Sequence, residues 1–213
     1  MAKTEAPLLS FGGSGQIAKT QVYATWRGIA YARRYVIPAN PNTANQQETR
    51  SVFAYLSNIW KLSSAILQGP WTTFAKGKPL TNRNAMMGQN IKVLRPGDDL
   101  TGFIGSPGAN GGLPPAGMAV TASGDVVSAV FDLPALPSGW SIAAVQAVML
   151  VDVDPHTATT FASLAGEATT TPWTVALTAP GAGSYLVSGW IKFLKPDGST
   201  AFGPSINATV TVT

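Results

Sequence analysis

The sequence predicts an α+β, mainly β fold built in two parts: a small hairpin-plus-helices N-terminal domain and a C-terminal antiparallel β-sandwich. Short β-rich runs recur between turn-forming clusters after residue 117, which is the pattern of an all-β domain. Residues 44–67, by contrast, contain neither Gly nor Pro and carry apolar residues at helical spacing. A chain of 213 residues that is 45% hydrophobic can form one large domain or two small ones.

The N-terminal part begins with a Gly-rich segment, residues 1–20, which we predict to be a flexible arm. The alternative is an arm that becomes ordered against a neighbouring subunit. Alternation of Val22, Ala24 and Trp26 with polar residues, followed by a second aromatic and β-branched run to Ile37, predicts a hairpin. We expect its turn near Arg27-Gly28.

Three helices are predicted between residues 44 and 94. Asn42 or Thr43 can supply the N-cap of the first helix, whose apolar stripe has 4-3-4-3 spacing: Val52, Leu56, Ile59, Ser63 and Ile66. Gly69-Pro70 ends or kinks this helix, and Pro70 can start a second, short helix that runs to Lys76. Thr81 can cap a third helix from Asn82 to about Leu94.

Residues 96–117 are rich in Gly and Pro, so we predict that they form a linker between two domains. The next 96 residues contain six β-rich runs: Ala119–Ala122, Val126–Leu133, Ile142–Val153, Trp173–Leu177, Tyr185–Leu194 and Asn207–Val212. This number and spacing are typical of an immunoglobulin-like (Ig-like) or fibronectin III-like sandwich. The predicted organisation is therefore an arm (1–20), a basic hairpin-helical docking domain (21–95), a linker (96–117) and a β-sandwich domain (118–213).

Charge is scarce and unevenly distributed. Only 11% of residues are charged, against about 25% in an ordinary soluble domain. Residues 1–95 hold twelve basic and two acidic residues, a net charge of +10, whereas residues 96–213 have a net charge of −6. This asymmetry indicates two modules with different partners, and the low total charge is typical of a chain whose surface is shared with neighbours.

Several function classes are excluded or disfavoured. The absence of Cys excludes disulfides and thiolate chemistry, and no apolar run is long enough for secretion or for a membrane span. No nucleophile motif is present. His156 with Asp152 and Asp154 provides too few ligands for zinc or calcium, so we interpret these three as solvent-facing residues at a strand end. We expect no enzymatic activity, no cofactor, no metal and no membrane partner.

The candidate functional residues lie in the basic N-terminal region. Arg27, Arg33 and Arg34 interleave with aromatic residues, a pattern that binds either an acidic protein surface or the phosphates and bases of a nucleic acid. The candidate partner-docking residues are Arg27, Arg33, Arg34, Arg50, Trp26, Tyr31 and Tyr35. A third hypothesis is glycan binding through Trp140, Trp173 and Trp190, although a sandwich commonly buries a Trp.

Residues 20–95 resemble a known family. The resemblance rests on four motifs: W-R-G at residues 26–28, P-A-N-P-N-T-A-N-Q at residues 38–46, the two Trp-bearing segments at Trp60 and Trp71, and T-N-R-N at residues 81–84. They are similar to an uncharacterised family of tailed-bacteriophage structural (virion) proteins with a W-[RK]-G…P-x-x-P-x-T-x-x-Q motif. Met86 and Met87 stand where that family often has an aromatic residue, a change in packing alone.

The resemblance implies a function in the phage particle. Together with the missing catalytic residues, the charge asymmetry and the N-terminal arm, it leads us to expect a non-enzymatic head decoration or minor capsid protein, made in the cytoplasm of the host bacterium and located in the virion. Tail or baseplate attachment is the close alternative, and nucleic-acid binding by the basic region is another. The implied partners are capsid or tail subunits, with a homo-oligomer or many copies in an assembly. The C-terminal part resembles, by architecture, the Ig-like modules that phages attach to capsid and tail proteins.

Overall fold

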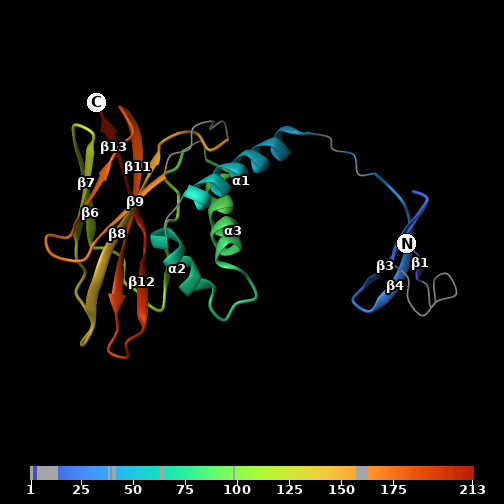
Figure 1. Cartoon of the computed structure of the whole chain (residues 1–213), viewed down its shortest axis with the longest axis horizontal. Coiled ribbons are helices and arrows are strands. Elements are labelled where there is room, and N and C mark those ends of the chain that lie inside the picture. The colour runs from blue at the N-terminus through green and yellow to red at the C-terminus, as the bar shows by residue number, and fades with distance from the viewer. Residues whose placement is uncertain are drawn as a thin grey trace. The chain divides into compact units, whose positions relative to one another are not determined.

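A computed structural model describes residues 2–3, 14–37, 39, 42–62, 65–97, 99–156 and 163–213. The fold is α+β and mainly β, and the chain forms two compact units, Met1–Asn42 and Thr43–Thr213 (Figure 1). We call the first the hairpin unit and the second the body. They are described in turn.

The hairpin unit is an antiparallel sheet in the order β1-β4-β3-β2, with β1 at Ala2–Lys3, β2 at Gly15–Ile17, β3 at Gln21–Trp26 and β4 at Ile29–Arg34. Arg27 and Gly28 connect β3 to β4 with positive φ angles of 50° and 79°, as a two-residue type I′ turn requires. The predicted hairpin is therefore confirmed. The prediction of a flexible arm over residues 1–20 is wrong for Ala2–Lys3, which pairs with β4, and for Gly15–Ile17, which pairs with β3. Residues 4–13 of the predicted arm lie outside the described residues.

The body begins with three helices: α1 at Ala44–Leu62, α2 at Ala65–Ala75 and α3 at Asn82–Leu94. The predicted cap of α3 is confirmed, since the Asn84 N–H donates to the Thr81 hydroxyl at 3.2 Å. The predicted start of the second helix at Pro70 is wrong, because Pro70 lies inside α2, where the buried side chains of Leu67 and Trp71 flank it. None of the described helices combines the length and the apolar character that crossing a membrane requires.

Two antiparallel sheets complete the body. The small sheet has the order β10-β7-β6, with β6 at Gly117–Ser123, β7 at Val126–Asp132 and β10 at Thr174–Thr178. The large sheet has the order β5-β12-β11-β8-β9, and β13 also pairs with β11. Its strands are β5 at Pro107–Ala109, β8 at Ser141–Val151, β9 at Ser163–Ala168, β11 at Gly183–Leu194, β12 at Thr200–Pro204 and β13 at Ile206–Val212.

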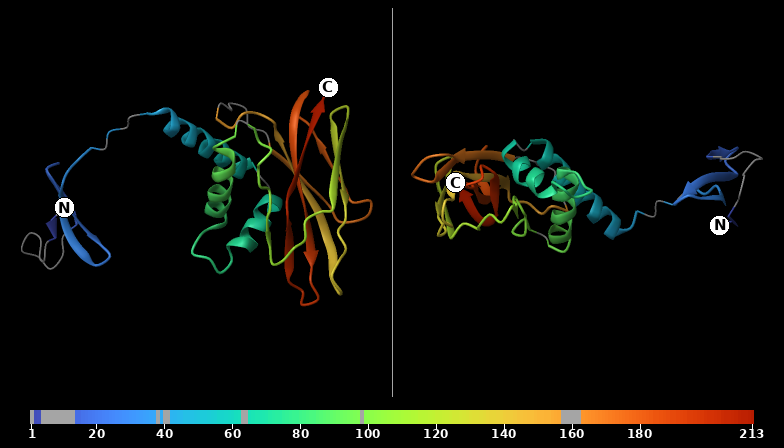
Figure 2. Two further views of the ribbon diagram at one scale, coloured as in Figure 1. Left: turned by 180° about the vertical axis from the view of Figure 1, so that it is seen from behind. Right: turned by 90° about the horizontal axis from the view of Figure 1, so that it is seen from below.

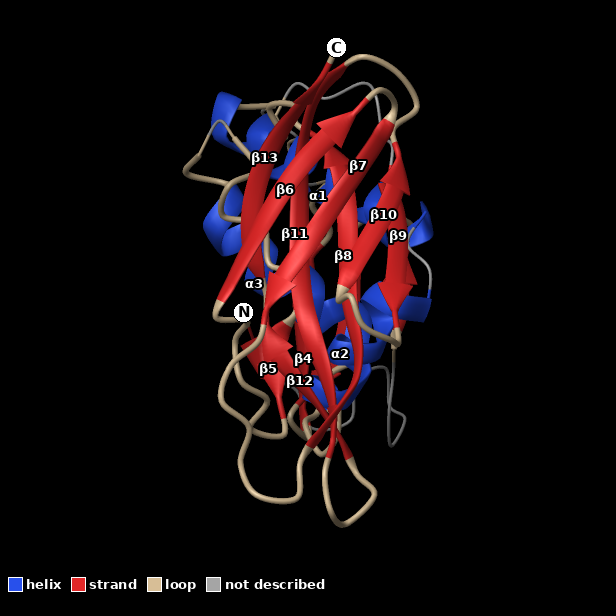
Figure 3. Ribbon diagram, turned by 90° about the vertical axis from the view of Figure 1, so that its left-hand side faces the viewer, coloured by secondary structure: helices blue, strands red, loops and turns tan. Residues whose placement is uncertain are grey.

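The large sheet is the middle of three layers, with the helices on one face and the small sheet on the other (Figures 2 and 3). Strand β8 contributes side chains to both faces of the large sheet. Val145 and Ala147 point to the small sheet, whereas Val148 and Leu150 point to the helices, because successive strand residues face opposite sides. The body therefore has two hydrophobic cores that share one sheet.

The predicted linker at residues 96–117 is wrong, since its middle part packs in the core between the helices and the large sheet. Leu100 and Phe103 are almost fully buried there, at 0% and 1% exposure. The buried amide of Asn90 in α3 donates to the Ile104 carbonyl at 3.1 Å and accepts from the Ile104 N–H at 2.8 Å. The three helices thus belong with the β-sheets, and the chain divides between Asn42 and Thr43 instead.

Candidate docking surface

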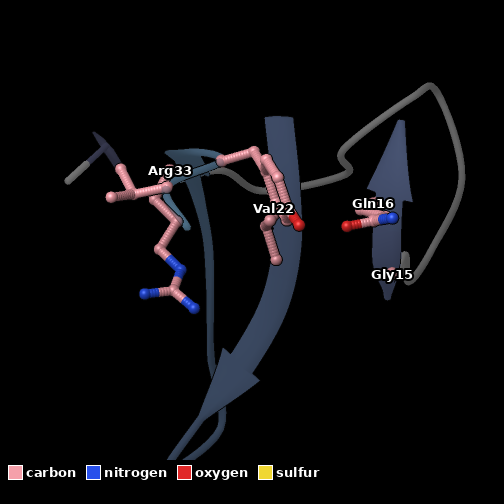
Figure 4. Close-up of a pocket in the computed structure, with 6 residues that line it drawn as sticks. Gly15, Gln16, Val22 and Arg33 are labelled. Carbon is pink, nitrogen blue, oxygen red and sulfur yellow. The ribbon is translucent and has the colours of Figure 1, made fainter. Parts of the chain in front are cut away.

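One face of the hairpin unit gathers most of the predicted docking residues. Cross-strand partners share a face, and the register pairs Val22 with Arg33, Ala24 with Tyr31 and Trp26 with Ile29. Tyr35 lines a hollow of about 340 Å³ together with Arg33, Val22 and Gln16, which places it on the same side. Figure 4 shows Gln16, Val22 and Arg33, which come from β2, β3 and β4. We call the set Trp26, Ile29, Tyr31, Arg33 and Tyr35 the hairpin face.

The hairpin unit has no buried side chain among its described residues. Trp26 is 63% exposed and Ile29 is 44% exposed, and in the segment after β4 Val36 and Ile37 are 67% and 76% exposed. A small sheet without a buried hydrophobic face is marginally stable in water. Large apolar side chains exposed together mark a surface that binds a partner.

At the tip of the hairpin, Arg27 lies 4.9 Å from the centroid of the Trp26 ring. A guanidinium over an indole face is attracted by the ring quadrupole, worth about 0.5–1 kcal/mol at an exposed site. The positive φ of Arg27 fixes the backbone that brings the two side chains together. The tip therefore presents one cation and one aromatic ring as a preorganised pair.

Three of the predicted docking residues are not part of the hairpin face, and one of them is Arg27, which lies in the turn between β3 and β4. Arg34 pairs with Gln21, and both side chains point to the opposite side of the sheet from Arg33. Arg50 belongs to α1, in the body. The period-two alternation of a strand could have separated Arg33 from Arg34 at the sequence level.

Arg50 instead lines a polar groove between the start of α1 and the end of α3. Two adjoining hollows of about 570 and 410 Å³ share Asn45 and Arg95, and Lys92 and Glu48 line the larger of them. This groove holds three cations and one acid. The sequence did not indicate Lys92 or Arg95 as candidates, because only the packing of α1 against α3 brings them to Arg50.

His156 differs from its predicted solvent-facing position. Its side chain is 13% exposed, Nδ1 lies 3.0 Å from Asp154 Oδ1, and Nε2 lies 3.1 Å from the Arg95 carbonyl oxygen. Asp152 accepts instead from the Ser184 hydroxyl at 3.1 Å. Within the described part of the chain, no group of three or more His, Cys, Asp or Glu side chains could hold a metal ion. The histidine thus connects the loop after β8 to the end of α3.

The Trp residues of the sheets are packed to different degrees. Trp190 is fully buried and its indole N–H donates to the Gln146 side chain at 2.9 Å, so it is not accessible to a glycan. Trp140 packs edge-on against Phe193 at 5.8 Å between ring centroids, and Lys195 lies 4.9 Å from its ring. Trp173 is half-buried. These positions favour structural roles for the three rings.

Comparison of the chain with protein-family models gives no match, and no curated protein matches it significantly.

Proposed function

We propose that this chain is a non-enzymatic structural protein of a bacteriophage virion, a decoration or minor capsid protein of the head that docks through its basic N-terminal unit. The observation that carries the proposal is the hairpin unit, a sheet with no buried side chain among its described residues and with exposed Trp26 and Ile29. Such a sheet gains a hydrophobic core only from a partner. A multi-copy particle provides that partner permanently.

Charge supports the same proposal. Residues 14–37 contain four basic residues and no acidic residue: Lys19, Arg27, Arg33 and Arg34. A uniformly basic surface is complementary to an acidic protein surface, and this complementarity speeds association and excludes wrong partners. The docking surface therefore fits acidic capsid subunits, or tail or baseplate subunits as the close alternative, with the protein made in the host bacterial cytoplasm.

We infer further that the sheets of the body form an Ig-like or fibronectin III-like sandwich. In a constant-type immunoglobulin domain the first, second, fourth and fifth strands share one sheet, and the third, sixth and seventh share the other. Apart from β5 and β12, the body has the same division without a fourth strand in the small sheet, which holds β6, β7 and β10, while β8, β11 and β13 lie in the large sheet. The additional β9 pairs beside β8, as an added strand does in variable-type domains.

The experiment is incorporation into particles. Virions purified from cells that express tagged wild-type protein, Trp26→Ala or Thr25→Ala are analysed for the tagged chain by mass spectrometry and immunogold labelling. We expect wild type and Thr25→Ala in the particle and a strong depletion of Trp26→Ala, since Thr25 faces the opposite side of the same strand. Absence of the wild-type chain from virions contradicts the proposal.

Nucleic-acid binding is the second candidate, favoured by the alternation of Tyr31, Arg33 and Tyr35 on one side of the hairpin unit. Such an arrangement can stack bases and contact phosphates. Its test is a salt titration of single-stranded and duplex DNA binding, in which phosphate contacts give a steep negative slope of log K against log salt concentration. Absence of binding at ~50 mM salt rejects this candidate.

A further inference from the structure

The outward face of the small sheet has an unusual composition. Alternation along β6, β7 and β10 buries Val127, Ala129 and Phe131 against the large sheet and leaves eleven positions pointing outward. They are Gly117, Ala119, Thr121, Ser123, Val126, Ser128, Val130, Asp132, Thr174, Ala176 and Thr178, which we call the outer face. Its single charged residue is Asp132, and the exposed Val126 and Val130 lie at its middle strand.

An outer face of this kind is unusual for a sheet that stays in water. Exposed sheet surfaces normally carry Lys, Glu and Arg, which prevent two sheets from associating. Here most side chains are small or β-branched, so they stand out little from the sheet. A flat surface of small residues is suited to another sheet, packed face to face about 10 Å away.

The hairpin face complements the outer face in size. It carries Trp26, Tyr31 and Tyr35, large side chains that stand out from a small sheet. The outer face offers Ala119, Ala176 and several Ser and Thr residues between them. Large side chains from one sheet can therefore fill the space that small side chains leave on the other.

The two faces also complement each other in charge. Residues 14–37 contain no acidic residue, and residues 96–191 contain no Lys or Arg. The second range includes both β-sheets of the body, apart from the end of β11 and the whole of β12 and β13. Two hairpin faces brought together would place Arg33 against a second Arg33, which costs free energy, whereas a hairpin face on an outer face meets Asp132. Charge thus favours the crossed pairing over the pairing of like faces.

We propose that the hairpin face of one copy packs on the outer face of a second copy, and that the exchange is reciprocal, giving a two-fold dimer. The proposal rests on the structural role inferred above and concerns the protein before it joins a particle, when a second copy of this chain covers the hairpin face. The hairpin sheet limits the contact: β3 and β4 have six residues each and β2 has three, so the sheet covers at most roughly 14 Å by 20 Å. Two such contacts, counted on both partners, bury about 1,100 Å², which is at the low end of specific interfaces.

The test is sedimentation equilibrium of the full-length protein at ~50 mM and ~500 mM salt, with two matched pairs of variants. Arg33→Glu changes the hairpin face, and Arg34→Glu makes the same charge change on the opposite side of the sheet. Val130→Lys changes the outer face, and Leu164→Lys places the same charge at an exposed apolar position of β9. Circular dichroism checks that each variant is folded.

We expect wild type to be a dimer that weakens as salt increases. Arg33→Glu and Val130→Lys should each raise the dimer Kd by about tenfold or more, whereas Arg34→Glu and Leu164→Lys should change it less than about threefold. A wild-type chain that is monomeric at ~100 μM and ~50 mM salt overturns the proposal. Equal losses in Arg33→Glu and Arg34→Glu overturn it too, because a face-specific contact distinguishes them.

The dimer and the structural role in the particle can fail independently, and the two experiments distinguish these failures. A chain that enters virions but remains monomeric in solution, with Val130→Lys incorporated like wild type, refutes the crossed dimer and leaves the structural role. A chain that forms the dimer but never appears in virions supports the contact and refutes the role. Chemical cross-linking between Lys19 and Asp132 of the outer face, read in a mixture of isotope-labelled and unlabelled protein, assigns the contact to two copies or to one.

Discussion

The hairpin unit and the body are stabilised by different means. The body buries the side chains of three helices and two sheets in two cores that share the large sheet. The hairpin unit has regular backbone pairing in four strands but no buried side chain among the described residues. The difference teaches that backbone hydrogen bonds can define the shape of a unit that has no hydrophobic core among its described residues.

The largest expected contrast is between two tryptophans. Trp190→Ala in β11 removes a fully buried ring and its hydrogen bond to Gln146, so we expect the free energy of unfolding to fall by about 3–5 kcal/mol. Trp26→Ala, at a site 63% exposed, should change it by less than about 0.5 kcal/mol in the monomer. Urea denaturation followed by circular dichroism measures both. A loss above about 2 kcal/mol for Trp26→Ala would contradict the conclusion that Trp26, unlike Trp190, is not part of a hydrophobic core.

The second contrast lies within α3. Asn90→Ala leaves the part-buried N–H and carbonyl of Ile104 without their partner, so we expect a loss of about 1–3 kcal/mol in the free energy of unfolding. Asn84→Ala is the control, because Asn84 is an exposed asparagine of the same helix. Hydrogen exchange of the Ile104 amide provides a second measurement. Equal effects of the two variants would argue that the segment after α3 is not anchored by Asn90.

Alkaline pH tests the burial of Tyr55 in α1. Burial, and secondarily the negative charge of Asp152, raise the pKa of Tyr55 in the folded state above its ordinary value. The contribution of protonated Tyr55 to the free energy of unfolding is therefore complete below pH ~10. It is lost as the pH rises further, at up to about 1.4 kcal/mol per pH unit. Tyr55→Phe should lose less stability than wild type between pH ~9 and ~11 in parallel denaturation curves. Identical losses in both proteins would contradict the prediction.

The smallest contrast compares two threonines at turns. Thr81→Ala removes the N-cap of α3 and should lower the free energy of unfolding by about 1 kcal/mol, whereas Thr81→Ser should retain most of it. Thr20→Ala removes the hydrogen bond from the hydroxyl to the Ile17 carbonyl in the hairpin unit. We expect its effect on global unfolding to stay below about 0.3 kcal/mol, since the hairpin unit is outside the body's cores. Thermal unfolding measures both, and similar effects would contradict the separation of the two units.

Local sequence patterns were sufficient to predict the elements whose conformation is determined by residues close to them in the sequence. The Arg27-Gly28 turn and the Thr81 cap were predicted correctly, and each of the six β-rich runs after residue 117 contains a strand. Strand β9, with the sequence SLAGEA, was missed because Ala and Gly have low strand propensity and β8 imposes the pairing. Composition likewise suggested a linker at residues 96–117, where long-range bonds from Asn90 and Trp71 hold a buried segment.

The types of residue on the candidate docking surface could be predicted from the sequence, whereas their arrangement in space could be predicted only in part. Aromatic and basic residues in β3 and β4 could be seen in the sequence, and the alternation of a strand separates Arg33 from Arg34. The position of Arg50 beside Lys92 and Arg95 follows from helix packing, which no local pattern encodes. The outer face could not be recognised either, because its residues become one surface only when β10 pairs with β7.

The scarcity of basic residues in the sheets has a practical consequence for detecting the protein. Trypsin cleaves after Lys and Arg but not before Pro, and Arg95 is followed by Pro96, so digestion leaves Val93–Lys192 as one 100-residue fragment. A fragment of that size is easily missed in a routine peptide survey, and nearly half of the chain would then leave no trace. Chymotrypsin, which cleaves after aromatic and large aliphatic residues, divides the same region at many sites. A proteomic inventory of particles should therefore use it beside trypsin before the chain is counted as present or absent.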